Sequence, residues 1–174
     1  ETGISCQNTN LSMENTTIEG NMNSENCAGF VIVNTIQLQT LNYNFNNVTV
    51  SNNTAAGGGG GLCLSGDLNI ENINILGNQA QEGGGGIRIS GTSNIFLDNI
   101  IVSQNSSATI GGGILTMSSG NIIIVNSTIS DNIANHGGGI QLYLGESSYI
   151  FDNLIITNNY ATLDGGGINL NWVS

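Results

Sequence analysis

Residues 78–105 read NQAQEGGGGIRISGTSNIFLDNIIVSQN, and this stretch decides the fold. Apolar residues alternate with a polar residue in 87–89, and two further short apolar segments follow at 95–97 and 100–102. This alternation is typical of β-strands with one buried face, because successive side chains point to opposite faces of a sheet. The Ser, Gly, Asn and Asp residues between the segments favour turns. The stretch therefore predicts three short strands separated by tight turns.

The same pattern recurs along the whole chain. Three glycines followed by Ile or Leu occur five times, ending at Leu62, Ile87, Ile114, Ile140 and Ile168. The motif Asn-x-x-(Ile/Val)-x-x-Asn occurs six times, starting at Asn15, Asn47, Asn72, Asn99, Asn126 and Asn153. Repeats of near-constant length indicate stacked units, in which each strand pairs with its equivalent in the next unit. We therefore predict an all-β chain: a right-handed single-stranded parallel β-helix of about six coils, each with three short strands.

The first copy is degraded, since Cys27-Ala28-Gly29-Phe30 replaces the glycine run. We therefore expect an irregular first coil over residues 1–29 and regular repeats over residues 30–174. The last coil of such a stack would present unpaired strand edges, which invite pairing with a further coil. We accordingly expect the chain to be a fragment of a longer array.

Stacking explains why amides and glycines are abundant and charges are rare. Like charges in register repel each other, whereas asparagine side chains in register hydrogen-bond to each other. Both asparagines of the motif are therefore expected to form internal ladders at corners with left-handed backbone. The glycine run is expected to form a corner with positive φ or with no room for a Cβ atom.

Charge excludes several classes of function. The chain has 12 acidic residues, a single Lys or Arg (Arg88) and a formal net charge of −11. Binding to nucleic acid or to anionic lipid needs a basic surface, so neither is expected. No apolar run reaches the ~18 residues of a membrane-spanning helix, so this segment is not expected to insert into a membrane.

The repeat resembles that of the polymorphic membrane proteins, a chlamydial adhesin family with Phe-x-x-Asn and Gly-Gly-Ala-Ile motifs. The resemblance is clearest at Asn78 with Ala80 and Gly84–Ile87, and at Asn132 with Ala134. The family's Phe position holds Ile or Val in every copy. The resemblance implies a parallel β-helix displayed outside the cell or on its surface. It also implies an adhesive role within a larger protein, with a protein or glycan of a host or neighbouring cell as partner.

The leading functional hypothesis is thus a non-enzymatic adhesion or recognition module. The alternatives are a β-helix that binds or cleaves carbohydrate and a structural stalk with no ligand. Candidate binding residues are Tyr43, Phe45, Arg88 and Tyr143, although aromatic residues in such repeats are more often part of the core. Catalysis is disfavoured because Arg88 and His136, the basic candidates, lie about two coils apart in the repeat alignment.

One pair of carboxylates could bind a metal ion. Glu71 and Asp98 precede the first asparagine of adjacent copies, so they are expected to stack within several ångströms. One hypothesis is that a Ca²⁺ ion bridges them. The alternative is a solvated acidic edge that keeps the protein soluble. We expect no other cofactor.

Two kinds of covalent modification can be considered. Six N-glycosylation sequons start at Asn10, Asn15, Asn47, Asn52, Asn105 and Asn126. Because four of these lie on the expected internal ladders, Asn10 and Asn52 remain as candidates. A disulfide between Cys6 and Cys27 would close the first coil, leaving Cys63 as an outward free thiol. The alternatives are that all three cysteines are reduced or that a partner cysteine lies outside the chain.

Overall fold

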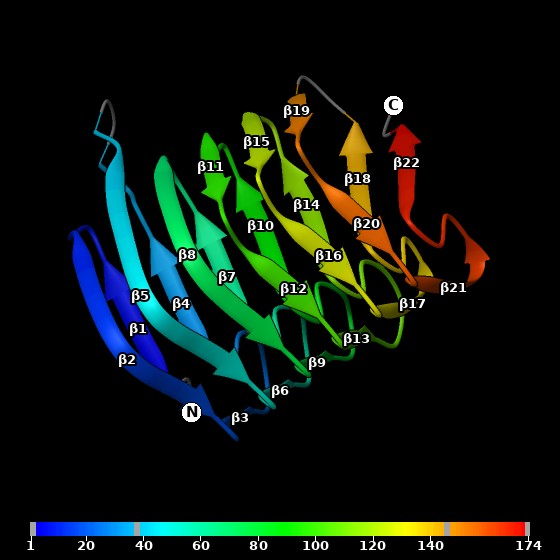
Figure 1. The fold of residues 1–174 in the computed structure, drawn as a ribbon, viewed down its shortest axis with the longest axis horizontal. Coiled ribbons are helices and arrows are strands. Elements are labelled where there is room, and N and C mark those ends of the chain that lie inside the picture. The colour runs from blue at the N-terminus through cyan, green and yellow to red at the C-terminus, as the bar shows by residue number, and fades with distance from the viewer. Residues whose placement is uncertain (1–2, 37–38, 145–146, 173–174) are drawn as a thin grey trace.

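Each coil contributes short strands to three parallel sheets (Figure 1), and the alternating apolar residues of these strands point into one core. The computed structural model describes residues 3–36, 39–144 and 147–172. The fold is a right-handed parallel β-solenoid of about six turns, as the repeats predict. The described residues include no helix that is long and apolar enough to cross a membrane.

Sheet A is formed by the strands that come directly after the glycine runs in the sequence and by their equivalents in the first coils. It contains, in spatial order, β1 (Ile4–Gln7), β4 (Phe30–Val33), β7 (Leu62–Ser65), β10 (Ile87–Gly91), β14 (Ile114–Ser118), β18 (Ile140–Leu144) and β22 (Ile168–Trp172).

Sheet B contains a bend. In three coils one long strand passes through it: β2 (Leu11–Glu19), β5 (Leu41–Ser51) and β8 (Leu68–Leu76). Strands before the bend are β11 (Ile95–Asp98), β15 (Asn121–Val125) and β19 (Ser148–Asp152), and strands after it are β12 (Ile101–Ser103), β16 (Thr128–Ser130) and β20 (Ile155–Thr157).

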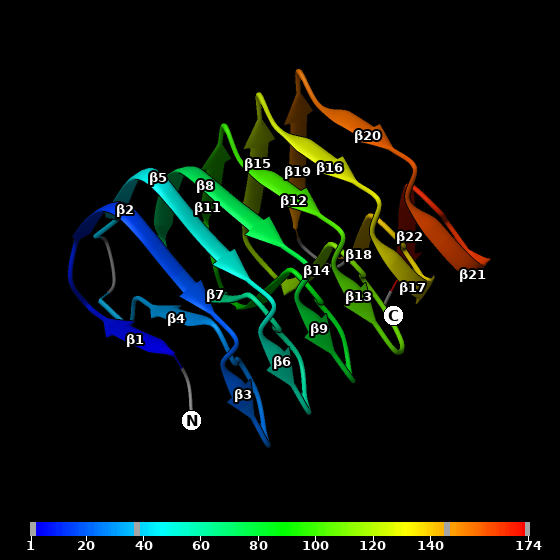
Figure 2. The same ribbon diagram turned by 60° about the horizontal axis from the view of Figure 1, so that its bottom comes forward.

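Sheet C is the third sheet and includes the shortest strands, of two residues each (Figure 2). It contains β3 (Met22–Asn23), β6 (Thr54–Ala55), β9 (Gln79–Ala80), β13 (Ser106–Ser107), β17 (Ile133–His136) and β21 (Tyr160–Asp164). Residues 3–29, for which we expected an irregular coil, contribute β1, β2 and β3, which pair in parallel with β4, β5 and β6.

Strand register follows the sequence repeats. Ile87, for example, pairs with Leu62 on one side and Ile114 on the other, so the residues after each glycine run form one inward column. There is an irregularity between β5 and β8, where Asn44 pairs with Glu71 but Val48 pairs with Ile73. At the bend, β5 therefore holds two more residues than β8.

Apolar columns from the three sheets fill the interior. The core includes Tyr43 and Phe45, each 1% exposed, and the ring of Phe45 packs edge-on against Phe30 at 6.1 Å. The prediction that Tyr43 and Phe45 are binding contacts is therefore wrong: both rings point inward from β5 because they share its inward alternation with Leu41.

The second asparagine of each motif forms the predicted interior ladder. The Nδ2 atom of each donates to Oδ1 of the next at 2.9–3.0 Å, through Asn21, Asn53, Asn78, Asn105, Asn132 and Asn159. The left-handed conformation lies one residue earlier than predicted, at Gly20, Asn52, Gly77, Gln104, Asp131 and Asn158. This turn directs the following asparagine inward.

The glycine corners also match the prediction. The first glycine of each triplet has a positive φ, for example 64° at Gly84. The next leaves no room for a side chain, because a Cβ atom on Gly85 would lie 2.3 Å from the carbonyl oxygen of Ser106. Glycine therefore fits this corner, where the Cβ atom of any other residue would clash with the neighbouring coil.

The disulfide differs from the prediction. Cys27 is bonded to Cys63, with their Cα atoms 5.7 Å apart, and Cys6 is a buried free thiol. Cys6 pairs with Ile32 on the inward side of sheet A, whereas Cys63 lies on the outward side, between the buried Leu62 and Leu64. The prediction of a Cys6–Cys27 bond with a free thiol at Cys63 is therefore wrong, because the Cys6 side chain faces the core.

Candidate functional site: an amide-lined groove

The first asparagine of each motif forms a column on the outside of the bend in sheet B. All six have a left-handed backbone with φ between 48° and 60°, as predicted, and all six are exposed: Asn15, Asn47, Asn72, Asn99, Asn126 and Asn153. The prediction that this column is internal is therefore wrong. The left-handed residue bends the chain while the residue after it points inward, so the asparagine side chain itself is left outside.

This outer column is hydrogen-bonded only in pairs. Nδ2 of Asn47 donates to Oδ1 of Asn15 at 3.0 Å, and Nδ2 of Asn99 donates to Oδ1 of Asn72 at 2.7 Å. Between these pairs no hydrogen bond joins Asn47 to Asn72 in the described chain. The break coincides with the irregularity of β5, where Phe45, Asn46 and Asn47 lie between the pairs Asn44–Glu71 and Val48–Ile73 and only Asn72 lies opposite them. A second break separates Asn99 from Asn126, whose Nδ2 atom donates to Asp98 instead.

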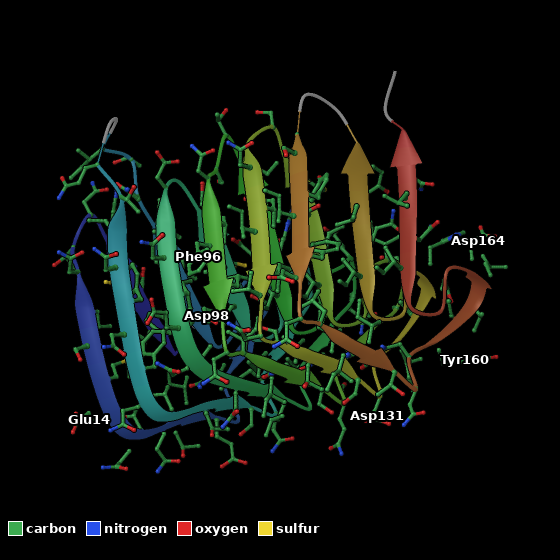
Figure 3. All side chains as sticks on the ribbon, turned by 45° about the horizontal axis from the view of Figure 1, so that its top comes forward. Glu14, Phe96, Asp98, Asp131, Tyr160 and Asp164 are labelled. Atoms are coloured by element: carbon green, nitrogen blue, oxygen red, sulfur yellow. A yellow bond between two sulfur atoms is a disulfide. The ribbon has the colours of Figure 1, made fainter. Side chains whose placement is uncertain are left out.

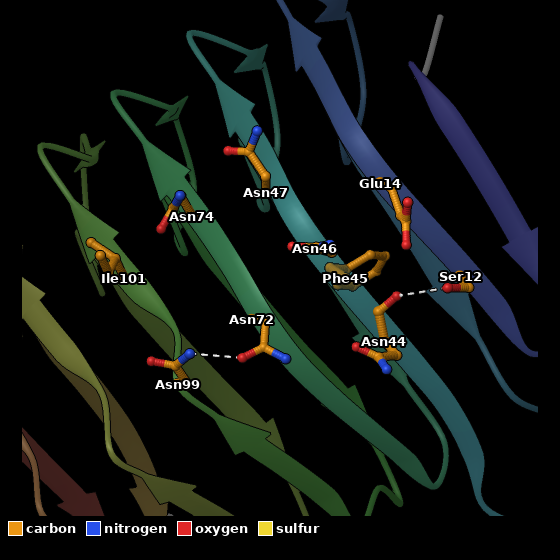
Figure 4. Close-up of a pocket in the computed structure, with 10 residues that line it drawn as sticks. All are labelled: Ser12, Glu14, Asn44, Phe45, Asn46, Asn47, Asn72, Asn74, Asn99 and Ile101. Atoms are coloured by element: carbon orange, nitrogen blue, oxygen red, sulfur yellow. Dashed lines mark hydrogen bonds between the residues drawn. The ribbon is translucent and has the colours of Figure 1, made fainter.

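A groove of about 620 Å³ lies over this break (Figure 4). The side chains that line it come from neighbouring coils on both sides of the bend: Ser12, Glu14, Asn44, Phe45, Asn46, Asn47, Asn72, Asn74, Asn99 and Ile101. Since Phe45 is 1% exposed, the main exposed apolar side chain here is Ile101, at 42%. The groove is therefore a polar surface rich in neutral amides.

Several of these amides have no hydrogen-bond partner among the residues that the structure describes. The side chains of Asn44, Asn46 and Asn74 make no hydrogen bond with any described residue, and the described part of the chain offers no acceptor to Nδ2 of Asn72. Asn47 uses its Nδ2 atom but leaves its Oδ1 atom free within the same ranges. The groove thus presents both hydrogen-bond donors and acceptors to solvent.

The predicted carboxylate pair lies beside this groove. Asp98 pairs in register with Glu71, and both are half-buried. Oδ1 of Asp98 accepts a hydrogen bond of 2.8 Å from Nδ2 of Asn126 (Asp98 is labelled in Figure 3). Within the described ranges, no cluster of three or more His, Cys, Asp or Glu residues could hold a metal ion. Calcium binding at Glu71 and Asp98 stays a prediction.

The other predicted contacts lie elsewhere. Arg88 is on the outward side of β10 in sheet A, opposite Cys63, and its Nη1 atom donates to Oδ1 of Asn26 at 3.1 Å. Tyr143 is half-buried on β18, also in sheet A. The structure therefore does not bring Tyr43, Phe45, Arg88 and Tyr143 together into one site.

His136 has a partner that the sequence reasoning missed. Its Nδ1 atom lies 3.0 Å from Oδ2 of Asp164, at the corner between sheet C and sheet A. His136 and Asp164 occupy the same position of adjacent repeats, and this equivalence in the sequence could have predicted their contact. His136 is in sheet C and Arg88 is in sheet A, so the two basic groups belong to different surfaces.

The sequons fall into two classes. Asn10 and Asn52, the predicted acceptors, are both exposed. Asn105 is fully buried, as predicted, whereas Asn15, Asn47 and Asn126 are exposed because the first asparagine column lies outside. Their exclusion as glycan acceptors is therefore corrected.

A family model described as a right-handed β-helix region matches residues 2–173. Comparison with curated proteins and with solved structures gave no match.

Proposed function

The chain belongs to the right-handed β-helix family, and from this premise we propose that it is a non-enzymatic recognition module outside the cell. Its role would be adhesive, of the kind implied by the resemblance to polymorphic membrane protein repeats. The observation that carries this proposal is the amide-lined groove on the outer face of sheet B. Its partner would be a protein or glycan of a host or neighbouring cell.

The Cys27–Cys63 bond supports the extracellular location. Disulfides form and persist in oxidising compartments and are rare in the cytosol. The bond joins the corner before β4 to β7 and so ties neighbouring coils together. The formal charge of −11 supports solubility in such an environment.

The groove chemistry supports binding without cleavage. Acid–base cleavage of a glycosidic bond uses two carboxyl groups on opposite sides of the bond. Among the residues that line the groove, Glu14 is the single carboxylate and the other polar groups are amides and a hydroxyl. A rigid solenoid wall with fixed neutral amides fits a recognition surface.

Adhesion of coated beads tests the proposal. We would attach the purified chain to fluorescent beads, apply them to panels of animal, plant and microbial cells, and count the beads bound after washing. We expect saturable binding to a subset of cells that soluble chain competes away, and no binding of beads coated with heat-denatured chain. Release of reducing ends from a polysaccharide panel would instead assign an enzyme, and no cell binding at all would leave a structural stalk.

A further inference from the structure

We propose that the groove over the bend of sheet B binds an uncharged, hydroxyl-rich chain, that is, a neutral oligosaccharide. This inference rests on the proposed function, since it names the ligand class of the same surface. It is carried by the break between Asn47 and Asn72 in the outer asparagine column, where Oδ1 of Asn47 and Nδ2 of Asn72 have no hydrogen-bond partner among the described residues.

The free amides are already positioned. Nδ2 of Asn47 is held by Asn15, so its Oδ1 acceptor is left facing the groove region. Oδ1 of Asn72 is held by Asn99, so its Nδ2 donor is left free among the described residues. Because each side chain is fixed through one atom, binding through the other atom costs less rotamer entropy than ordering a free side chain.

The mixture of donors and acceptors selects the ligand class. A hydroxyl group both donates and accepts, so a hydroxyl-rich chain can use the free Oδ1 and Nδ2 atoms alike. A carboxylate or phosphate only accepts, and Glu14 in the groove wall would repel it. An ammonium group only donates and would leave the Asn72 donor unused.

A protein ligand fits this surface less well. Protein interfaces are centred on buried aromatic or apolar anchors, ringed by polar groups. Here Phe45 is buried in the core and Ile101 is the main apolar side chain that is open to the groove. A polar groove with scattered neutral amides therefore favours a hydroxyl-rich ligand over the surface of a partner protein.

The groove also suits a chain-like ligand. Its walls come from β2, β5, β8 and β12, which are successive rungs of the solenoid. Neighbouring strands lie about 4.8 Å apart, so a ligand along the axis meets new amides at each rung. A single sugar would contact fewer of them, and we expect longer oligosaccharides to bind more tightly.

The test is an array of neutral, acidic and basic oligosaccharides, followed by titration calorimetry with the best neutral binder. Asn47→Gly and Asn72→Gly remove the amides while glycine keeps the left-handed backbone. Asn153→Gly is the matched control, since it has the same conformation in the same column but does not line the groove. We expect each groove variant to raise Kd about tenfold, the effect of losing about one hydrogen bond, and the control to leave Kd unchanged.

Three results would overturn the inference. One is binding of neutral glycans that neither groove variant weakens, and another is selection of acidic or basic glycans alone. The third is cell adhesion by the coated beads without glycan binding, which would point to a protein ligand and leave the proposed recognition function standing. Loss of adhesion to every cell type would instead remove the proposed function itself.

Discussion

Asn105 and Asn132 lie 27 residues apart and are joined by a hydrogen bond of 3.0 Å from Nδ2 of the first to Oδ1 of the second. Neither residue is exposed to solvent. The second proton on Nδ2 of Asn105 is donated to the carbonyl oxygen of Ile75 at 2.9 Å, and Oδ1 accepts from both the backbone N–H and Nδ2 of Asn78. Asn105 therefore connects three coils, and its amide is fully satisfied.

Asn105→Ala should destabilise the protein by about 3 kcal/mol or more, because it strands buried donors on Asn78 and the buried Ile75 carbonyl. Urea denaturation would measure the loss. The control is Asn153→Gly, which removes one exposed hydrogen bond and should cost less than about 1 kcal/mol. Equal losses for the two variants would mean that the interior ladder does not hold the coils together.

The fold could be predicted because the repeat phase carries the strand register. Once Ile87 aligns with Leu62 and Ile114, the pairing of the sheets follows, and the structure has that pairing. Stacking of amides likewise predicted an internal ladder of the second asparagines, such as Asn78, but the same reasoning placed the first asparagines inside as well. These features depend on period alone, which a single sequence displays.

The groove could not be predicted in the same way. Whether the first asparagine points in or out depends on which residue has the left-handed backbone, and both asparagines tolerate that conformation. The irregularity at β5 arises because Leu41 pairs with Leu68 before the bend whereas Val48 pairs with Ile73 after it. The motif spacing from Asn47 to Asn72 matches the second pairing and does not reveal the first. The prediction of the disulfide failed for a related reason. The Cys6 side chain points inward because Cys6 pairs with Ile32, and this pairing is not evident in the degraded first repeat.

Removing the disulfide should weaken the N-terminal coils. The Cys27→Ser, Cys63→Ser double variant opens a bond that spans 36 residues, so a loss of about 2–4 kcal/mol is expected. Cys6→Ala is the control, because it keeps this bond. Alkylation of the unreduced, denatured protein followed by peptide mapping should label Cys6 alone. Labelling of Cys63 instead of Cys6 would contradict the Cys27–Cys63 bond and support a bond between Cys6 and Cys27.

The glycine corners allow a matched comparison at one position of the repeat. A Cβ atom on Gly86 would lie 2.7 Å from the Gly113 carbonyl oxygen, whereas on Gly167 its nearest neighbour would be Cγ2 of Ile156 at 3.5 Å. Gly86→Ala should therefore lower the melting temperature by several degrees, through a loss of at least about 2 kcal/mol. Gly167→Ala should leave it nearly unchanged. Similar melting temperatures for both variants would contradict close packing at the corner.

Glycan mapping would test which sequons are outside. If the chain is secreted from eukaryotic cells, we expect glycans at exposed sites such as Asn10, Asn52 and Asn126 and none at Asn105 in folded protein. Asn15 and Asn47 are hydrogen-bonded neighbours, so a glycan on one should exclude a glycan on the other. Mass spectrometry of the glycopeptides would measure the occupancy of each site and show whether Asn15 and Asn47 are ever glycosylated together. Full occupancy of Asn105 in folded protein would contradict the interior ladder.

Tyr43 should make the protein sensitive to alkali. Its hydroxyl donates to the Thr9 carbonyl oxygen at 2.7 Å, and burial, with a smaller effect of the neighbouring Cys6, raises the pKa of Tyr43 far above its ordinary value. Above about pH 10 the unfolded chain releases the tyrosine proton while the folded chain keeps it. The folded state therefore binds more protons, and its stability falls as pH rises, by up to about 1.4 kcal/mol per pH unit.

Tyr43→Phe should remove this part of the alkaline slope, at a cost of about 1 kcal/mol near neutral pH, because the Thr9 carbonyl loses its donor. The free energy of unfolding, measured in urea from about pH 8 to pH 11.5, gives both quantities. Tyr160→Phe is the control, since it removes the hydroxyl of a tyrosine that is 59% exposed rather than buried. Because the chain has Arg88 as its single Lys or Arg, no lysine titration obscures the comparison. An unchanged slope in Tyr43→Phe would show that this hydroxyl is not held in the core.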